Sequence, residues 1–345
     1  MQVQAKKKFV FWFGLDVSKG SFVAACGSLP QLIEGTQPET MAFALNKKGV
    51  RAFLKWAGAL AGDFEFGVAM EATGVYSRTL SGLISDISPA QHVAVCNALS
   101  VSHYARSFSD EKSDKADAAV IARYACERQP QEPRKLSPER ERLREIARFR
   151  NALVKQKIDA TNRLQTLEGG LVRKIQQSFI RKLERDIQTL EKELRNLVKA
   201  SPDICHEVTL MMTVPGVGFV SAACIYAEYG SLKDYTRKQI SALSGVCPVN
   251  RQSGTSLDKH AISHKGPKMT RRILFLDSTP AIKGIPALQA LHERLLSRPK
   301  SSKMTAKCAC MRKLLLILHA MVVSDTTFDP NHQSVKNIKN VKKPA

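Results

Sequence analysis

The sequence predicts an α/β domain over residues 1–136, a coiled-coil helical hairpin over residues 137–200 and a mostly α-helical, basic domain over residues 201–330. Strand-like and helix-like segments alternate through the first part, and a proline-rich stretch separates it from the second. The second part is charged and rich in leucine, whereas the third combines helical periodicity with an excess of lysine and arginine. Residues 331–345 contain four lysines and no acidic residue, so we expect a disordered tail.

The elements of the first domain follow from the spacing of its apolar residues. Residues 9–16 and 21–26 are rich in Phe, Val and Ala and flank the turn-like Ser18-Lys19-Gly20, which predicts a β-hairpin. Further strands are expected at residues 65–70 and 92–96, and helices at residues 42–60, 76–87 and 114–127. A hairpin followed by alternating strands and helices predicts a mixed sheet.

The middle segment carries a heptad pattern. Leu and Ile residues recur between Leu183 and Leu197 at alternating spacings of four and three. Leu143, Ile146, Phe149 and Leu153 form a similar stripe upstream, with a Gly-Gly pair between the two halves. The pattern predicts an antiparallel hairpin that pairs with itself or with a second subunit, and a solvated helical spacer is the alternative.

The charge of the chain indicates a polyanionic partner. A net charge of +22 and a pI near 9.8 favour nucleic acid first and a membrane surface second. The net charge is +3 for residues 1–136, +7 for residues 137–200 and +12 for residues 201–345. We therefore expect acidic chemistry in the first domain and nucleic-acid binding in the rest.

Signals for export, membrane insertion and zinc binding are weak. No apolar run in the sequence reaches the roughly 18 to 20 residues needed to cross a bilayer. The basic, apolar start lacks a small-residue cleavage site and is interrupted by Asp16, so we interpret it as a first strand. Eight scattered cysteines indicate a reducing cytoplasm. The spacings of the following residues fit no zinc pattern: His260, His264, Cys247, Cys308 and Cys310.

Four acidic residues stand where the expected fold would bring them together. Asp16 and Glu71 end predicted strands, and Asp114 and Asp117 open a predicted helix at a spacing that puts both on one face. Two-metal phosphoryl transfer uses such hard oxygen ligands to hold Mg²⁺. Each residue alone is also consistent with a turn, a helix cap or a partner of the helix dipole. Their combination predicts a magnesium site.

The sequence MTVPGVG, residues 212–218, lies between two predicted helices. It resembles the turn of a helix-hairpin-helix element, in which glycines let backbone N–H groups approach a DNA phosphate. Gly216 and Gly218 are therefore candidate nucleic-acid contacts. A tight turn without a ligand is the alternative.

The acidic residues lie in motifs that resemble a known family. GLDVSK (residues 14–19), MEATGVY (70–76) and KSDKADA (112–118) are similar to the motifs of the DEDD transposases of bacterial insertion-sequence family 110. That family includes a 1111-type subgroup and the Piv-type DNA invertases. Asp16, Glu71, Asp114 and Asp117 match its D, E, D and D. The resemblance implies a ribonuclease-H-like fold similar to RuvC, with these four carboxylates holding Mg²⁺.

Residues 214–275 resemble the C-terminal transposase domain of the same family, in which a serine attacks DNA and becomes covalently joined to it. The match implies Ser253 as the nucleophile. Many relatives have two serines and two glycines where this chain has Gln-Ser-Gly-Thr, so Ser256 is the alternative. No base stands beside either serine in the sequence, which would leave activation to the metal and carboxylates of the first domain.

Basic residues around the serine are expected to hold phosphate oxygens, with a solvated basic face as the alternative. They are Arg251, Lys259, Lys265, Lys268, Arg271 and Arg272.

The resemblance implies a transposase or site-specific recombinase that acts on donor and target DNA, as a dimer or tetramer, guided by a structured noncoding RNA. Such a protein would be cytoplasmic and nucleoid-associated, in a bacterium or archaeon. Three alternatives stay open. One is a RuvC-like nuclease or junction resolvase that uses water, another is an invertase acting on fixed sites, and the third is a coiled-coil protein that binds nucleic acid without cutting it.

Overall fold

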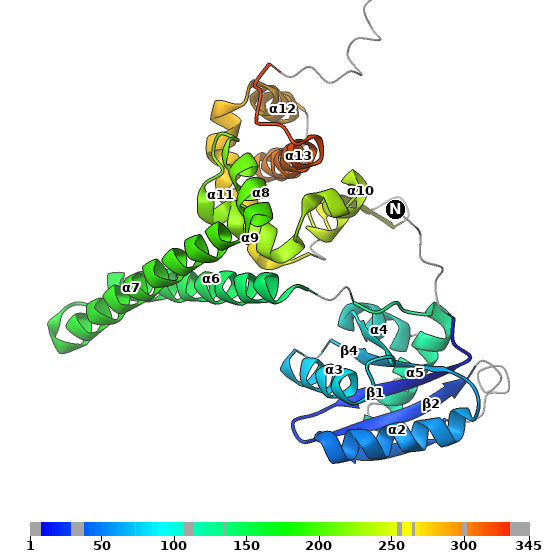
Figure 1. The fold of residues 1–345 in the computed structure, drawn as a ribbon. Coiled ribbons are helices and arrows are strands. Elements are labelled where there is room, and N and C mark those ends of the chain that lie inside the picture. The colour runs from blue at the N-terminus through cyan, green and yellow to red at the C-terminus, as the bar shows by residue number, and fades with distance from the viewer. Residues whose placement is uncertain are drawn as a thin grey trace, which may run out of the picture. The chain divides into compact units, whose positions relative to one another are not determined.

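The computed structural model describes residues 8–28, 38–72, 74–106, 114–133, 136–253, 257–263, 266–298 and 302–331. The chain divides into two compact units, residues 1–135 and 136–345, and each is described by itself (Figure 1). The helical hairpin and the C-terminal helices, which we expected as separate domains, therefore fall in one unit. The expected tail lies, apart from Asn331, outside the described residues.

The first unit is built on a mixed sheet, as predicted, and this sheet has five strands, one more than expected. The strands lie in the order β3-β2-β1-β4-β5. Strand β1 pairs antiparallel with β2 and parallel with β4, while β3 extends the antiparallel side and β5 the parallel side. Their bounds are β1 Phe11–Val17, β2 Ser21–Ser28, β3 Thr40–Ala44, β4 Phe66–Glu71 and β5 His92–Cys96.

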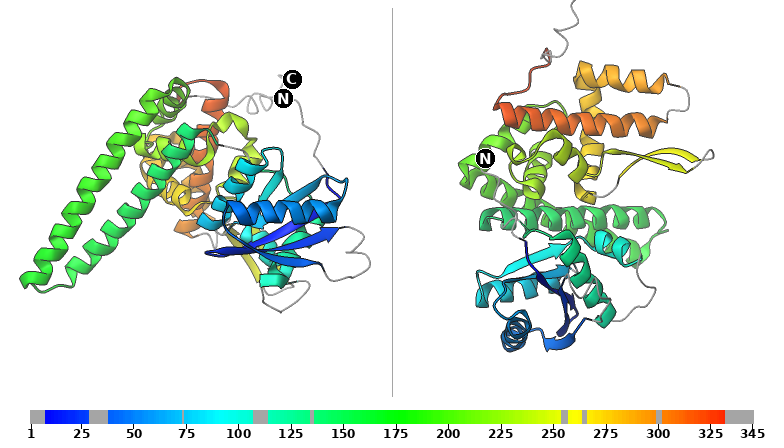
Figure 2. Two further views of the ribbon diagram at one scale, coloured as in Figure 1. Left: turned by 60° about the horizontal axis from the view of Figure 1, so that its bottom comes forward. Right: turned by 90° about the vertical axis from the view of Figure 1, so that its right-hand side faces the viewer.

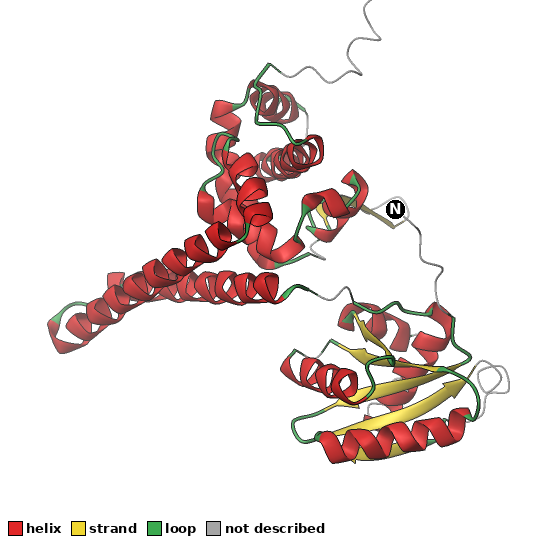
Figure 3. Ribbon diagram, in the orientation of Figure 1, coloured by secondary structure: helices red, strands yellow, loops and turns green. Residues whose placement is uncertain are grey.

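Helices cover both faces of this sheet (Figure 3). Helices α2 (Lys47–Ala61) and α3 (Val75–Ile87) bury Phe53 and Leu80 against one face, where Phe13 and Leu15 also point. Helices α4 (Ala98–Ala105) and α5 (Asp114–Arg128) cover the other face, with Ile121 packed against Trp12. Successive side chains of β1 thus point to opposite faces of the sheet, as expected for a β-strand.

One expectation for this unit was wrong, and one helix was missed. Residues 42–60 were expected to be one helix, but Thr40–Ala44 pairs with β2 as strand β3. The chain then turns at Asn46, whose side chain accepts a hydrogen bond from the Gly49 N–H and begins α2. Helix α4 was not expected, although Asn97 caps it in the same way through the Leu99 N–H.

The second unit begins with a long hairpin of helices α6 (Pro138–Gln165) and α7 (Gly170–Ala200). Ser137 caps α6 ahead of Pro138, and Gly169 and Gly170 make the turn with positive φ. The two helices pack on each other within one chain, so the hairpin pairs with itself, which is one of the two pairings expected.

Seam residues of the hairpin are buried in two groups. Leu153, Ala160, Leu183 and Ile187 form a cluster of their own toward the turn. Leu143 and Leu194 instead join the core of the C-terminal helices, which attaches the base of the hairpin to them. Phe149, expected in the seam, is exposed.

The remainder of the unit is mostly helical, as expected, with one β-hairpin that we did not expect. In Figure 2, strands β6 and β7 extend from the helices of their unit. No described helix is long and apolar enough to cross a bilayer. The elements are α8 Pro202–Met212, α9 Phe219–Tyr229, the 3₁₀ turn η1 Leu232–Asp234, α10 Arg237–Leu243, β6 Pro248–Ser253, β7 Leu257–Ile262, α11 Lys268–Gly284, α12 Pro286–Leu296 and α13 Lys303–Ser324.

A buried carboxylate joins the hairpin to the C-terminal helices. Glu228 of α9 accepts hydrogen bonds from Arg144, at 3.0 Å, and from Arg148, at 2.7 Å, both on α6. Arg140 donates to the Glu228 backbone carbonyl at 3.0 Å. Burial raises the pKa of Glu228, but the guanidinium groups of Arg148 and Arg144 outweigh it and hold the pKa below its usual value.

Replacing Gly14 by alanine is expected to destabilise the first unit by about 1–3 kcal/mol. A methyl group there would overlap the backbone of Ala118 and Ala122 in α5. Both tryptophans, Trp12 and Trp56, lie in this unit, so denaturant unfolding followed by tryptophan fluorescence measures it directly. Gly58→Ala is the control, because a methyl group there meets nothing within 4 Å and a helical alanine should stabilise. Equal effects of the two variants would contradict the close approach.

Glu228→Gln should destabilise the second unit by roughly 1–3 kcal/mol, because it leaves two arginines without their charged partner. Denaturation followed by circular dichroism measures the loss. The pKa of folded Glu228 is lowered, so the difference should be complete above pH 4.5, the ordinary value, and shrink as the pH falls through the lower one. Glu145→Gln, which removes an exposed pair with Arg142, should cost much less. A comparable cost for the two variants would rule out a special role for Glu228.

Candidate carboxylate active site

Asp16 and Glu71 lie side by side because of the register between two parallel strands. Leu15 of β1 pairs with Met70 of β4, so the next residue of each strand lies at the same level of the sheet. Glu71 in turn pairs with Cys96 at the end of β5. The carboxyl ends of three parallel strands therefore meet at one edge of the sheet.

Both carboxylates lie on the face of the sheet that α5 covers. Gly14 faces the backbone of α5, and Asp16, two residues further along β1, faces the same way. Ala69 packs with Trp12 under α5, so Glu71 also belongs to this face. Asp117 stands in the first turn of α5, directly before the residue whose carbonyl approaches Gly14. The fold thus brings Asp117 to the edge where the two strands end.

The pKa of Glu71 indicates that Asp16 and Asp117 lie near it. Burial raises the pKa of Glu71, and the negative charges of Asp16 and Asp117 raise it further. Glu71 is half-buried, Asp117 is exposed and Asp16 is intermediate. A carboxylate whose ionisation is disfavoured by two acidic neighbours belongs to a cluster that a divalent cation would stabilise.

The donor atoms of this cluster are carboxylate oxygens, which suit Mg²⁺. In the described part of the chain, no three acidic, histidine or cysteine side chains are gathered tightly enough to hold a metal ion as they stand. Asp114 begins α5, but its side chain is not among those described. Cys96 is a poor ligand, because burial and the charge of Glu71 raise the pKa of its thiol to about 11.

Ser253 lies in the second unit, at the end of β6, where it pairs with Leu257 of β7. Its side chain is not among those described, and Ser256 lies outside the described residues. Arg251 and Lys259 pair across the same hairpin. The unexpected strands therefore carry the predicted nucleophile at the tip of a β-hairpin.

Three of the other predicted basic contacts belong to the start of α11. Lys268 is exposed, and Arg271 and Arg272 follow it in the first two turns. Arg271 donates a hydrogen bond to the carbonyl of Gly266, just before the helix. Lys265 lies outside the described residues.

The two glycines of the 212–218 turn have different surroundings. Gly216 has a φ of +90°, and a Cβ atom there would meet the backbone of Ala281 and Asp277 in α11. Packing therefore accounts for this glycine without any ligand. Gly218 precedes α9 and has open space around it.

Sequence reasoning missed three basic residues that the structure gathers near Arg271 and Arg272. Arg237, Arg312 and Lys313 line the same cavity of the second unit. They come from α10 and α13, which lie far apart in the sequence, so no local pattern pointed to them.

Comparison with known proteins agrees with this arrangement of motifs. A family model of transposases of the DEDD type of IS110 matches residues 13–168, and the model of the transposase IS116/IS110/IS902 family matches residues 208–293. Together they cover more than two thirds of the chain.

Relatives include the pilin gene-inverting protein of Moraxella bovis, which is 27% identical over 92% of this chain and 97% of its own length. The transposase for insertion sequence element IS1111A of Coxiella burnetii is 36% identical over 27% of this chain and 25% of its own. The chain belongs to the IS110 family of transposases and is an enzyme that acts on DNA.

Proposed function

We propose that the chain is a DNA transposase or site-specific recombinase that cuts and rejoins DNA through Ser253, with Mg²⁺ held by Asp16, Glu71, Asp114 and Asp117. One observation carries the metal site. Asp16 and Glu71 end neighbouring parallel strands beneath α5, and the charges of Asp16 and Asp117 raise the pKa of Glu71. Carboxylates from three elements around one sheet edge also support a ribonuclease-H-like fold for the first unit.

The carboxylates would hold the metal in their ionised form. Bound Mg²⁺ would polarise the scissile phosphate and offset the charge that develops on it. Glu71 resists ionisation because of its burial and its acidic neighbours, so this residue limits metal binding at low pH. Asp16 and Asp117 contribute both ligands and the negative field that draws the cation.

Ser253 would attack the phosphorus atom of a phosphodiester. Its hydroxyl oxygen forms a new phosphoester bond, and the bond from phosphorus to one deoxyribose oxygen breaks. The hydroxyl proton leaves the serine, and the departing deoxyribose oxygen takes up a proton. Attack by the freed DNA hydroxyl of another strand would release the serine and rejoin the DNA.

Nucleic-acid binding in this scheme belongs mainly to the second unit. The net charge is +7 over residues 137–200 and +12 over residues 201–345, against +3 for the first 136 residues. The candidate contacts at Lys268, Arg271 and Arg272 lie in this basic part. By family resemblance we also propose donor and target DNA, a structured noncoding guide RNA and a dimer or tetramer.

DNA inversion is the second candidate function. The relative named as a pilin gene-inverting protein matches over nearly its whole length. Inversion and transposition share the same chemistry and differ in whether the DNA sites are fixed. Neither the carboxylate cluster nor the serine separates the two.

Ser253→Ala and Asp16→Asn are each expected to abolish strand exchange, because one removes the nucleophile and the other a metal ligand. Both should retain DNA binding, since the basic surfaces are untouched. The measurement is recombination of a plasmid substrate, together with capture of a denaturant-resistant protein–DNA adduct in the presence of Mg²⁺. Asp63→Asn, at an exposed loop residue, is the control for Asp16.

Four results separate the possibilities. Loss of the adduct in Ser253→Ala but not in Ser256→Ala supports the assignment. An active Ser253→Ala protein together with an inactive Ser256→Ala protein would identify Ser256 as the nucleophile. If neither serine matters and strands are still cut, water is the nucleophile and the chain is a nuclease or resolvase. If DNA is bound but never cut, the catalytic proposal fails.

Mg²⁺ should stabilise the first unit, by about 1.4 kcal/mol at roughly ten times its Kd. The gain should shrink as the pH falls through the raised pKa of Glu71, because protonated Glu71 is a poor ligand. Without metal, ionised Glu71 lowers the free energy of unfolding, because its pKa is higher in the folded state than in the unfolded state. Glu71→Gln should therefore stabilise the metal-free unit at neutral pH. Tryptophan fluorescence during denaturation measures both effects. An equal Mg²⁺ effect in wild type and Glu71→Gln would exclude Glu71 as a ligand.

A further inference from the structure

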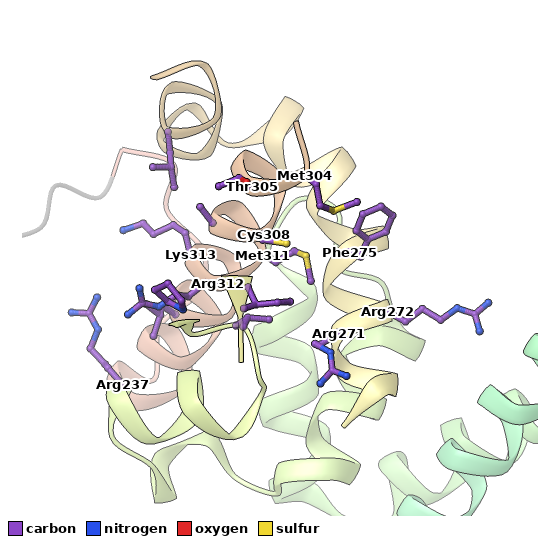
Figure 4. Close-up of a pocket in the computed structure, with 16 residues that line it drawn as sticks. Arg237, Arg271, Arg272, Phe275, Met304, Thr305, Cys308, Met311, Arg312 and Lys313 are labelled. Atoms are coloured by element: carbon purple, nitrogen blue, oxygen red, sulfur yellow. The ribbon is translucent and has the colours of Figure 1, made fainter. Parts of the chain in front are cut away.

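The second unit contains a cavity of about 960 Å³ between α10, the base of the β6–β7 hairpin, α11 and α13 (Figure 4). This volume is at the upper end of the range typical for ligand sites, about 300–1,000 Å³. Its lining residues come from segments that the core of the unit holds together, including Val246 and Met311, both buried. The cavity is therefore formed by the packed elements of the second unit.

The wall of the cavity is apolar and its charged groups have one sign. Phe275, Met304 and Leu316 are among the apolar residues. None of the sixteen described residues that line it is acidic, while five are basic: Arg237, Arg271, Arg272, Arg312 and Lys313. The chemistry fits a ligand with an apolar, flat or rounded body and at least one attached anion.

One of the arginines is already oriented. Arg312 donates through Nε to the hydroxyl of the buried Ser241, at 2.9 Å. Among the described residues its two terminal nitrogens have no hydrogen-bond partner, so they can donate hydrogen bonds to phosphate oxygens. A guanidinium fixed in this way also offers a planar surface on which a base can stack.

The charge of the surroundings favours a nucleotide over an acidic peptide. Nucleic acid combines an apolar base with a regular series of phosphates, and residues 201–345 carry a net charge of +12. An acidic peptide would also need acceptors for its backbone N–H groups, whereas the polar groups of the lining are mainly guanidinium donors and the rest is apolar carbon.

We propose that this cavity binds one unstacked nucleotide of the nucleic acid held by the second unit, with the base against the apolar wall and the adjoining phosphates on the arginines. The proposal rests on the proposed function, in which this unit binds nucleic acid. It adds that binding is not confined to paired strands. Single-stranded DNA and single-stranded RNA both supply such a nucleotide.

The test compares two variants of the same helix in the full-length protein. Ala309→Phe places a ring inside the cavity without changing charge, because Ala309 of α13 lines it. Ala320→Phe adds the same ring to α13 at an exposed residue outside the cavity. The probes are end-labelled single-stranded oligothymidine and oligouridine of about ten nucleotides and a blunt DNA duplex of equal length, each measured by fluorescence anisotropy.

Ala309→Phe should weaken single-strand binding at least about tenfold, while Ala320→Phe should leave it unchanged. Duplex binding should be the same in all three proteins, since paired bases cannot enter. An effect on the DNA or the RNA strand alone would support the proposal and identify the strand. Unchanged single-strand binding in Ala309→Phe would overturn it and leave the proposed function intact. Failure of the wild type to bind even the duplex would count against the proposed function.

A measurement on the wild-type protein covers the case in which Ala309→Phe does not fold. Cys308 lines the cavity, whereas Cys205 is comparably accessible but lies elsewhere, on α8. Bound oligonucleotide should slow iodoacetamide labelling of Cys308 several-fold and leave Cys205 unchanged. Labelling needs alkaline pH, because burial raises the pKa of the Cys308 thiol. Equal labelling with and without oligonucleotide, or protection by oligoglutamate but not by oligonucleotide, would overturn the proposal.

Discussion

The arrangement of the candidate active site depends on the direct contact between the backbones of β1 and α5. Gly14 on the strand and two small residues on the helix, Ala118 and Ala122, leave nothing between them. Asp16 lies two residues beyond Gly14, and Asp117 lies one residue before Ala118. The contact therefore sets the level at which a helix carboxylate meets the strand carboxylates, and a larger residue at position 14 would move them apart.

Sequence reasoning succeeded where the signal was local. Strands β1, β2, β4 and β5 alternate or form short apolar runs between turns, and α5, α6 and α7 are long and periodic. Strand β3 was missed because its alanines continue a helical pattern into α2, and only pairing with β2 makes it a strand. Strands β6 and β7 were missed because PVNRQS and LDKHAI are largely polar. The grouping of Asp16, Glu71 and Asp117 was predictable from strand ends and helix starts.

Features formed by distant segments could not be predicted in this way. The cavity of the second unit takes Arg237, Arg271 and Arg312 from three helices whose packing no local pattern reveals. For Gly216 the sequence left a phosphate contact and a tight turn without a ligand both open, and its neighbours in α11 are sufficient to explain a glycine there. A glycine in a turn looks the same in sequence whether the nearby atoms belong to a ligand or to another helix.

The helical hairpin of the second unit forms an arm, whose length sets the distance from its base to the Gly169–Gly170 turn. A helix of 31 residues, such as α7, is about 46 Å long at ~1.5 Å per residue. Because Leu194 is packed in the core at the base, about 36 Å from the turn, a tilt of about ten degrees there would carry the Gly169–Gly170 turn through roughly 6 Å. Adding one heptad to each helix would lengthen the arm by about 10 Å and keep the apolar seam in register. The reach of the arm is thus adjustable in whole heptads, independently of the chemistry at the carboxylates.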